Sequence, residues 1–474
     1  MVRVTPMSSA LGDFIVTDDG ETLYFFAKFD DGYDLWKTDL RKRETSMAKK
    51  LGYRYRSIQT DKDGNTLYLL GSDGLGKMGI SSESIKPIKY SATMKIDPQT
   101  EREYMFDYVK REEAARFYET GMHGVDWEAM TGAYRKFLPH INNNYDFADL
   151  LSEMLGELNV SHTGGRYYPD AAGERTASLG LIFDWDYYGD GLRVAEVVEG
   201  GPFDHANTVI KKGTIVEKIN GVALNDSTDY TALLADVAGK KTLVTLYNGN
   251  GNSVDEVVLP ISQGELNELL YRRWVKQREA DTERLSGGRL GYVHLRSMDD
   301  ASFRRIYTDL LGKYVDKEGI VIDTRWNGGG RLHEDIEMLF SGDKYLTQVI
   351  RGVDVCDMPS RRWNKPSIMV QCEANYSNAH GTPWVYKHKK MGKLVGMPVP
   401  GTMTSVNWET LQDPSLIFGI PVIGYRTAEG TYLENSQLEP DFKVANDPAT
   451  VVKGTDSQLK VAVDELLRQI DAAK

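Results

Sequence analysis

The sequence predicts a multidomain α/β protein, and three observations support that prediction. An Asp-Gly turn followed by an apolar strand occurs twice, at 19–26 and at 63–70, which indicates β structure over residues 1–91. From residue 97 to 159 the hydrophobic period becomes helical. Residues 263–474 alternate helices with buried strands, which is typical of a layered α/β domain.

The composition limits the classes of function. The net charge of -12 at pH 7 argues against nucleic-acid binding as the main function. Only Cys356 and Cys372 occur, so a disulfide framework is excluded, although the pair does not decide the redox compartment. No run approaches the roughly 20 apolar residues of a membrane span, and the N-terminus lacks the layout of a signal peptide. We therefore expect neither a nucleic acid nor a membrane as partner. We favour the cytoplasm, or the periplasm or export if an upstream signal has been removed.

The two Asp-Gly copies lie 44 residues apart (63 − 19), which is the spacing of β-propeller blades. Two copies are too few to close a ring. Residues 1–91 are therefore either a small β appendage or the tail of a longer propeller. We favour the propeller tail, which would make the chain a fragment of a longer protein.

Residues 92–170 are predicted to form a small helical domain. One helix is expected to start at Asp126, and another, capped by Asp146, is expected to stop at 156. His162 follows, between a strand-like segment and a double glycine. From this context alone, a half-buried structural histidine and a functional histidine are equally good interpretations.

Residues 171–262 carry a series of short strands. The segment 212–221 is predicted to be a hairpin with an Asn-Gly turn, and a helix is expected near 229–237. The pattern resembles a PDZ domain, a family that binds an extended peptide, often a C-terminus, by strand addition. On that resemblance the carboxylate-binding loop is formed by Leu179, Gly180, Leu181 and Ile182. A purely structural PDZ module is the alternative.

The stretch 366–392 predicts a buried strand, a small polar loop and a helix around Ser377. We expect the helix to begin at Thr382, with proline in its first turn, and to end near Gly392. Ser377 then lies in a strand-to-helix connection, close to backbone N–H groups that could hold an oxyanion. An ordinary polar loop is the simpler interpretation of this stretch taken alone.

A second buried strand, 319–325, leads into a run of three glycines, Gly328, Gly329 and Gly330. The run lacks the spacing and the trailing Lys-Ser/Thr of nucleotide-binding loops, so phosphate binding is a weak interpretation. Glycines after a buried strand also permit close backbone approach and free N–H groups, which an oxyanion hole needs.

Four segments stand in one order along the chain: 157–164, the PDZ-like module, 323–330 and 373–379. Together they resemble the tricorn-type branch of the tail-specific serine proteases, peptidase family S41. In that family β-propellers precede helical, PDZ and α/β core domains, so the resemblance covers nearly the whole chain. It implies four parts: a propeller-like fragment, a helical domain, a PDZ domain and a crotonase- or ClpP-like protease core, at residues 1–91, 92–170, 171–262 and 263–474.

The resemblance implies a serine peptidase without metal or cofactor, acting on oligopeptides or unfolded proteins. Ser377 resembles the nucleophile and His162 the general base, while Ser161 and Glu434 resemble the residues that complete the tetrad by orienting the histidine. The oxyanion donors would be backbone N–H groups of Gly328, Gly329, Gly330 and Asn378. We also expect a homo-oligomer.

Three positions refine this expectation. Tricorn proteins have an acidic residue directly after the nucleophile, where this chain has Asn378, so a preference for basic residues before the cut is not implied. His380 is unusual, and we expect it to be a solvent-facing loop histidine, with a cleft-lining role as the alternative. The other S41 branch places a catalytic lysine about 25 residues after the serine. That position is Thr402 here, which favours the tricorn mechanism.

Two other functions remain as alternatives. The chain could be a PDZ-centred peptide-binding adaptor with an inactive protease core. It could also be a crotonase-type enzyme acting on acyl-thioesters, although that reading leaves the PDZ-like module and the N-terminal repeat unexplained.

Overall fold

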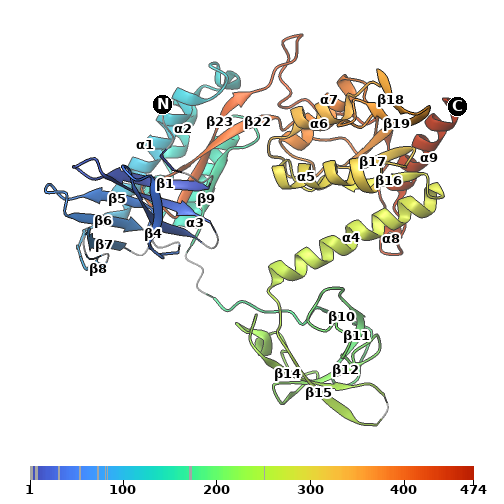
Figure 1. Cartoon of the computed structure of the whole chain (residues 1–474), viewed down its shortest axis with the longest axis horizontal. Helices are drawn as coiled ribbons and strands as arrows, with labels where there is room; N and C mark the ends of the chain where they lie inside the picture. Colours follow the sequence, from blue (N-terminus) through green and yellow to red (C-terminus); the bar gives the residue numbers. More distant parts are fainter. Residues whose placement is uncertain are drawn as a thin grey trace. The chain divides into compact units, whose positions relative to one another are not determined.

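The computed structural model describes residues 4–5, 9–29, 32–52, 55–71, 74–80, 82, 84–169, 173–249 and 251–474. It divides into two compact units, Met1–Ile96 and Asp97–Lys474 (Figure 1). The predicted boundary between residues 170 and 171 falls outside the described residues.

Within its described residues, the first unit consists of two four-stranded antiparallel sheets that each pair in chain order. The strands of the first sheet are β1 (Ala10–Val16), β2 (Thr22–Lys28), β3 (Tyr33–Asp39) and β4 (Glu44–Lys49). Those of the second are β5 (Ser57–Thr60), β6 (Thr66–Gly71), β7 (Gly74–Gly79) and β8 (Ile85–Ile88). The two Asp-Gly copies end in β2 and β6, so the repeat in sequence is also a repeat of structure. Side chains from both sheets, such as Phe26 and Leu67, fill one core.

The second unit begins with a helical part that also contains a small sheet. Its helices are α1 (Pro98–Arg116), α2 (Trp127–Arg135) and α3 (Asn144–Gly156), with short 3₁₀ turns η1 (Met122–Gly124) and η2 (Leu138–His140). The sheet is formed by β22 (Thr404–Thr410), β23 (Leu416–Gly424) and β9 (Gly164–Tyr167). Although β22 and β23 come late in the chain, β23 pairs with β9 and β22 pairs with β23 (Figure 1). Phe418 of β23 joins Phe106 and Phe147 in one core.

The cap of α3 differs from the prediction. Asn143 is the N-cap, and its Oδ1 accepts a hydrogen bond from the Asp146 backbone N–H at 2.9 Å. Asp146 lies in the first helical turn instead, where its negative charge suits the helix dipole.

Residues 181–258 form an antiparallel sheet in the order β10-β11-β12-β14-β15, with β13 paired to β12. The strands are β10 (Leu181–Phe183), β11 (Leu192–Val197), β12 (Ile215–Ile219), β13 (Val222–Ala223), β14 (Thr242–Tyr247) and β15 (Ser253–Val258). Asn220 and Gly221 have φ of 49° and 82°, as a type I′ hairpin turn requires. The helix expected near 229–237 is reduced to one 3₁₀ turn, η3 (Ala232–Leu234).

The last part is a layered α/β domain around a parallel sheet in the order β16-β17-β20-β21-β24. Its strands are β16 (Leu290–His294), β17 (Gly319–Asp323), β20 (Ser367–Gln371), β21 (Lys393–Gly396) and β24 (Phe442–Lys443). Alternation along β17 separates two cores: Ile320 and Ile322 pack with α5–α7 residues, and Val321 packs with α4 and α9 residues. The predicted layered α/β architecture is therefore confirmed.

The helices that cover the two faces come from separate stretches of the chain. They are α4 (Gln263–Ser286), α5 (Asp300–Thr308), α6 (His333–Phe340), α7 (Asn378–His388) and α9 (Ser457–Ala472). Smaller elements are the π-helical turn η4 (Asp309–Lys313), the hairpin of β18 (Leu346–Ile350) and β19 (Val353–Met358), and α8 (Pro448–Val451). Parallel strands end at one edge of the sheet, where the segments after β17 and β20 meet and where α/β proteins usually place their sites.

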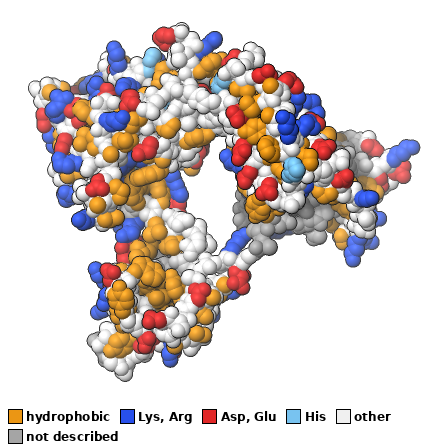
Figure 2. Space-filling view, turned by 180° about the vertical axis from the view of Figure 1, so that it is seen from behind, with side chains coloured by type: hydrophobic (Ala, Val, Ile, Leu, Met, Phe, Trp, Pro, Cys, Tyr) orange, Lys and Arg blue, Asp and Glu red, His pale blue; other side chains and the backbone are white. Residues whose placement is uncertain are grey.

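Acidic and basic side chains are intermingled over the face shown in Figure 2. Within the described part of the chain, no helix combines the length and apolar character that crossing a membrane requires. The same residues contain no group of three or more His, Cys, Asp or Glu side chains arranged to hold a metal ion.

Candidate active site

Ser377 lies at the junction between the loop after β20 and helix α7. The helix begins at Asn378, directly after Ser377, so the predicted start at Thr382 is wrong and Pro383 lies inside the helix. Ser377 has φ 59° and ψ -127°. Such a conformation costs a residue with a side chain about 1–3 kcal/mol and persists only where the surroundings impose it.

The surroundings of Ser377 include one contact that the sequence did not predict. The Ser377 N–H donates to Thr402 Oγ1 at 3.0 Å. Thr402 occupies the position at which a Ser-Lys dyad would carry its lysine, and here it holds the backbone of the serine.

Gly329 packs directly against Ser377. A Cβ at Gly329 would lie 2.5 Å from Ser377 Cβ and 2.8 Å from the Tyr376 carbonyl oxygen, and its φ of 97° also favours glycine. At Gly330 a Cβ would lie 2.2 Å from the Met298 carbonyl oxygen. Two of the three glycines are therefore required by close backbone approach.

The predicted oxyanion donors differ in availability. The Gly329 N–H is engaged, because it donates to Asn327 Oδ1 at 2.8 Å. No hydrogen bond recorded among the described residues engages the N–H of Gly328, Gly330 or Asn378. The Asn378 N–H is also the first of α7, where the helix dipole favours negative charge.

The Asn378 side chain has a structural partner. Its Oδ1 accepts from the backbone N–H groups of Leu332 and His333, at 2.8 and 3.0 Å, and so caps the start of α6. Its amide nitrogen contacts His333 Nδ1 at 2.7 Å. The residue is 3% exposed, and its side chain is used in these structural contacts.

His162 belongs to a hydrogen-bonded chain with Ser161 and Glu434. Ser161 Oγ lies 2.7 Å from His162 Nδ1 and 3.0 Å from Glu434 Oε2. The Ser161 N–H donates to the other carboxylate oxygen, Oε1, at 2.5 Å. Three of the four predicted catalytic residues are thus in direct contact, although Glu434 is more than 270 residues away from the other two in sequence.

The hydrogen bonds among Glu434, Ser161 and His162 determine the tautomer of the histidine. A carboxylate can only accept, so the Ser161 hydroxyl donates to Glu434 and accepts from Nδ1–H of His162. The lone pair is then on Nε2. Burial lowers the pKa of His162 to about 4, so the ring is neutral at neutral pH. Burial also raises the pKa of Glu434, which the hydrogen bonds from Ser161 partly offset.

Two further residues contact His162 and were not predicted. Thr404 Oγ1, from the start of β22, lies 3.1 Å from Nδ1. Tyr376 accepts a hydrogen bond from the His162 N–H on its hydroxyl, at 2.8 Å, and its ring lies 4.6 Å from the imidazole. Tyr376 immediately precedes Ser377, so it joins the histidine segment to the serine segment. No hydrogen bond between Ser377 Oγ and His162 is recorded among the described residues.

His380 does not face solvent, and that prediction is wrong. It lies in the first turn of α7 and is 0% exposed, and neither ring nitrogen has a hydrogen-bond partner in the described structure. Burial lowers its pKa to about 4. Its position follows from the early start of α7, which turns residue 380 inward.

The predicted carboxylate-binding loop lies beside a cavity whose residues are distant in sequence from Ser377. The loop consists of Leu179, Gly180, Leu181 and Ile182. The cavity has a volume of about 310 Å³ and is lined by Leu179, Leu181 and Ile182 together with residues near η3 such as Tyr230. Strand β10 lies at the edge of its sheet, so one side of its backbone is unpaired within that sheet. Gly180 N–H is engaged by Ser178 Oγ at 3.0 Å.

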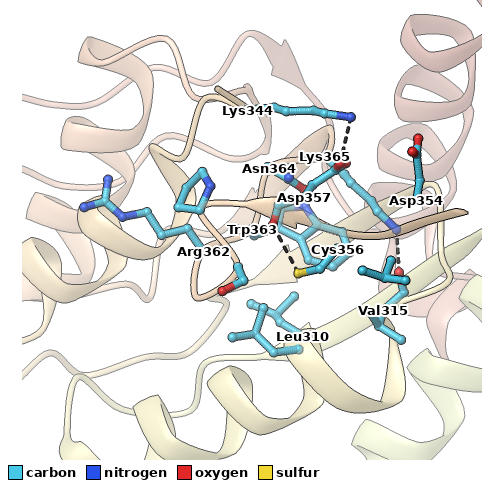
Figure 3. A pocket seen from close by; sticks show the side chains of 14 residues that line it. Leu310, Val315, Lys344, Asp354, Cys356, Asp357, Arg362, Trp363, Asn364 and Lys365 are labelled. Carbon is cyan, nitrogen blue, oxygen red and sulfur yellow. Dashed lines mark hydrogen bonds and ion pairs between the residues drawn. The ribbon is translucent and has the colours of Figure 1, made fainter. Parts of the chain in front are cut away.

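Two other cavities are lined at least in part by residues of the α/β domain. One of about 150 Å³ is lined by residues that adjoin the site, including Gly381 of α7, Met403 and Leu433. The other, of about 410 Å³, lies between η4 and β19 and is lined by Leu310, Val315, Lys344, Cys356 and Trp363 among others (Figure 3). This larger cavity shares no lining residue with the candidate site.

Two segments of the chain match known protein families, and several known proteins are similar to much of it. Residues 289–444 match Peptidase family S41, and residues 98–156 match the Tricorn protease C1 domain. Tricorn protease homolog 1 of Streptomyces coelicolor is 28% identical over 384 residues, 78% of this chain and 35% of the relative. The Tricorn protease of Thermoplasma acidophilum is 23% identical over 353 residues, 71% of this chain and 32% of the relative. The chain thus spans about a third of the length of these curated relatives.

A solved structure agrees in fold. The crystal structure of the tricorn protease superposes with a TM-score of 0.83 at 18% identity, over 97% of this chain and 47% of that chain. At this identity the likeness concerns the fold.

Through its layered α/β domain, the chain is similar to proteins of peptidase family S41 over residues 289–444. Within that family, the likeness is to tricorn proteases.

Proposed function

We propose that the chain hydrolyses peptide bonds with Ser377 as nucleophile and His162 as general base. The observation that carries the proposal is the Glu434–Ser161–His162 chain, because it leaves the lone pair on Nε2, the nitrogen that a nucleophile must reach. A serine hydroxyl is a weak nucleophile until a neutral imidazole accepts its proton. The lowered pKa of His162 supplies that neutral imidazole.

The proposed reaction has two halves. Ser377 Oγ attacks the peptide carbonyl while its proton moves to His162 Nε2, and that proton then passes to the leaving amine. Water next hydrolyses the acyl-enzyme, with His162 again accepting and returning a proton. Ser161 and Glu434 keep the imidazole in its tautomer and stabilise the imidazolium that forms.

The oxyanion would be held by backbone N–H groups. We assign this role first to Asn378, whose N–H begins α7, and to Gly328 or Gly330. The Gly329 N–H is the weaker candidate because Asn327 already engages it.

We further propose that residues 171–262 are a PDZ-like module that binds peptide beside Leu179, Gly180, Leu181 and Ile182. The 310 Å³ cavity and the edge position of β10 support this, since an extended peptide can add to an unpaired strand edge. Residues 1–91 would supply two propeller-like blades, as the repeated four-stranded sheets suggest. Oligopeptides or unfolded proteins are the proposed substrates, and a homo-oligomer is the proposed assembly.

A fluorophosphonate probe, which reacts with activated serines, tests the proposal. The wild-type chain should be labelled and should hydrolyse peptides. Ser377→Ala should fold normally, lose labelling, and lose about 10⁴–10⁶-fold in kcat. Labelling that persists in Ser377→Ala would contradict the assignment of the nucleophile. A wild-type chain that binds peptides but is neither labelled nor active would favour the adaptor function instead.

A further inference from the structure

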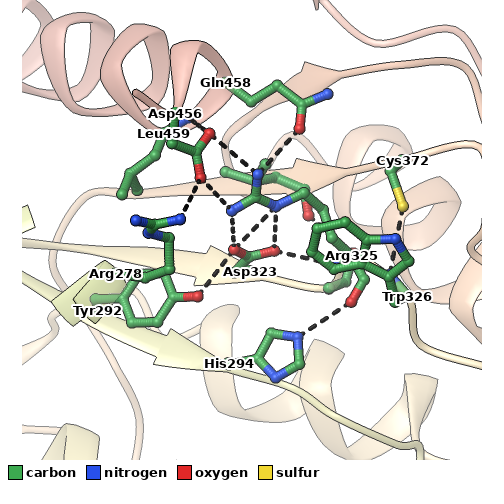
Figure 4. A network of polar contacts seen from close by, with 12 residues as sticks. Arg278, Tyr292, His294, Asp323, Arg325, Trp326, Cys372, Asp456, Gln458 and Leu459 are labelled. Atoms are coloured by element: carbon green, nitrogen blue, oxygen red, sulfur yellow. Dashed lines mark hydrogen bonds and ion pairs between the residues drawn. The ribbon is translucent and has the colours of Figure 1, made fainter. Parts of the chain in front are cut away.

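The C-terminal end of β17 carries a buried network of charges next to the candidate site. Arg325 is 1% exposed and Asp323 is 0% exposed. The Arg325 guanidinium donates to both oxygens of Asp323, at 2.6 to 3.0 Å, and to both oxygens of Asp456, at 2.9 and 3.1 Å. Its Nη1 also donates to Gln458 Oε1 at 3.0 Å (Figure 4).

The network joins this strand end to helices at both ends of the α/β domain's sequence. Asp456 is the N-cap of α9 and accepts from the Leu459 N–H at 3.0 Å. Arg278 of α4 lies 3.6 Å from Asp456, and Tyr292 of β16 donates to Asp323 at 2.9 Å. Arg278 also pairs with Asp281, at 2.9 Å. Helix α9 is thus tied to β17 through charged hydrogen bonds as well as through apolar packing.

The backbone of Arg325 is held as firmly as its side chain. Its N–H donates to Asp323 Oδ1 at 3.0 Å, and its carbonyl oxygen lies 3.1 Å from His294 Nε2 (Figure 4). The direction in which the chain leaves β17 is therefore imposed at Arg325.

Asn327 connects this strand end to the segment that contains Ser377. Its side chain donates to the Leu295 carbonyl oxygen at 2.7 Å and accepts from the Gly329 N–H at 2.8 Å. Its own carbonyl oxygen accepts from the Tyr376 N–H at 3.0 Å. Gly329 touches Ser377, so a continuous path of contacts runs from Asp456 to the serine.

Stability alone does not account for such a network. Taking ions out of water is unfavourable, and well-packed apolar groups of similar volume often stabilise as well or better. The planar Arg fork, however, fixes two carboxylates in one geometry. Reacting groups must be held within about 0.5 Å of their productive positions.

We infer that Arg325 and Asp456 are positioning residues, which set the glycine turn against Ser377 and make the docking of α9 a condition for catalysis. The inference rests on the proposed function, because it concerns the geometry of the same site. Neither residue contacts Ser377 or the histidine chain directly, so each acts through the turn.

Asp456→Asn tests the inference. Asparagine still caps α9, since its side-chain oxygen can accept from the Leu459 N–H, but the charge that Arg325 binds is lost. A displaced turn of about 1 Å can lower the rate about 100-fold. We expect kcat for a peptide substrate and the labelling rate at Ser377 to fall by about that factor, while KM changes little.

Asp471→Asn is the matched control. Asp471 lies at the other end of α9 and pairs with Arg289, on a partly exposed surface away from the site. The same chemical change is made on the same helix, so this variant shows how much the loss of a carboxylate charge on α9 by itself affects the rate. We expect Asp471→Asn to retain wild-type kcat and labelling rate.

The pH dependence separates positioning from a change at the base. In Asp456→Asn the profile of kcat/KM should keep its shape and lose only amplitude, because the surroundings of His162 are unaltered. If Asp456→Asn does not fold, Gln458→Met is measured with the same readouts. This change keeps a similar volume and removes the side-chain hydrogen bonds of Gln458 to Arg325, Asn446 and Val444. Wild-type kcat in the folded variants, or an equal loss in Asp471→Asn, overturns the inference. A wild-type chain that is not labelled overturns the proposed function, and the inference with it.

Discussion

Gly329 leaves no room for a side chain next to Ser377: a Cβ there would lie 2.5 Å from Ser377 Cβ and 3.0 Å from Ser377 Oγ. The contact explains why a glycine run follows β17, and it shows that the run shapes the site by close approach as well as by its N–H groups. The serine cannot move away freely, because Thr402 holds its N–H.

Gly329→Ala should therefore reduce activity severely. The added methyl must displace Ser377 or the turn, and a displacement of about 1 Å can lower kcat about 100-fold. The φ of 97° adds strain of about 1–3 kcal/mol to the folded state. Steady-state kinetics and urea unfolding measure the two effects.

Gly328→Ala is the control for that variant. A Cβ at Gly328 would meet nothing within 4 Å, and the residue keeps its N–H. Its loss of activity should be much smaller. Equal losses in both variants would mean that the run works through backbone freedom rather than through contact with Ser377.

The pH at which kcat/KM falls on the acid side should reflect the burial of His162. The base must be neutral, and burial lowers the pKa of His162 to about 4. The fraction of neutral histidine therefore rises as pH increases through about 4, and kcat/KM should already be level between pH 5.5 and 7.5. The kcat/KM profile of the free enzyme measures this limb directly.

Two variants check that assignment. His162→Ala should resemble Ser377→Ala, whereas Glu434→Gln should be milder, because the amide oxygen can still accept from Ser161. A limb centred near 6.5, the ordinary pKa of histidine, would contradict a buried base. Activity that survives His162→Ala but is lost in His380→Ala would mean that the base is misassigned.

His380 should make the fold sensitive to acid without contributing to catalysis. Its folded-state pKa of about 4 lies below the ordinary value of 6.5, so the unfolded chain binds more protons between these pH values. The free energy of unfolding therefore falls as pH drops from 6.5 towards 4. The shift corresponds to about 3 kcal/mol.

His380→Leu removes this proton uptake. Urea unfolding at pH 4.5 and 7.5 should show a smaller loss of stability in the variant than in wild type, with labelling at Ser377 retained at pH 7.5. His140→Leu, on the 3₁₀ turn η2, is the control, because that histidine is exposed. An unchanged pH dependence in His380→Leu would indicate that residue 380 is hydrated in solution.

The parts of the site that could be predicted are those with local signatures. Ser161 and His162 precede a double glycine, and the glycine run follows a buried strand, so each segment is recognisable along the chain. The resemblance to the S41 family then predicted that these segments form one site, which their spacing in the sequence could not show. Thr404 and Tyr376 could not be found this way, because they contact His162 only through the pairing of β22 with β23 and the turn before Ser377.

Local signals also misled at two points. Thr382 followed by proline is a strong helix start, but the loop that ends at Ser377 is held by Thr402 and Asn375, and α7 begins earlier. Asn143 and Asp146 are both good caps three residues apart, and only the hydrogen bond from the Asp146 N–H to Asn143 decides between them. In each case a tertiary or side-chain contact overrode a propensity.

The PDZ-like module should affect which peptides are cut more than how fast the chemistry proceeds. Binding energy gained far from the reacting bond lowers KM without raising kcat. Leu181 is a poor test site, because it is 8% exposed and packs in the core of the module, so Leu181→Asp would risk unfolding. Ile182→Asp is preferable, since Ile182 lines the 310 Å³ cavity and is only partly buried.

We expect Ile182→Asp to raise KM for long peptides and to leave short chromogenic substrates unaffected, because only long peptides can reach both the cavity and Ser377. Val257→Asp is the matched control: Val257 lies on β15, at the other edge of the same sheet, and is 58% exposed. It should behave as wild type with both substrate lengths. An equal effect of Ile182→Asp on long and short substrates would mean that the module is structural. It would then contradict the proposal that residues 179–182 bind peptide.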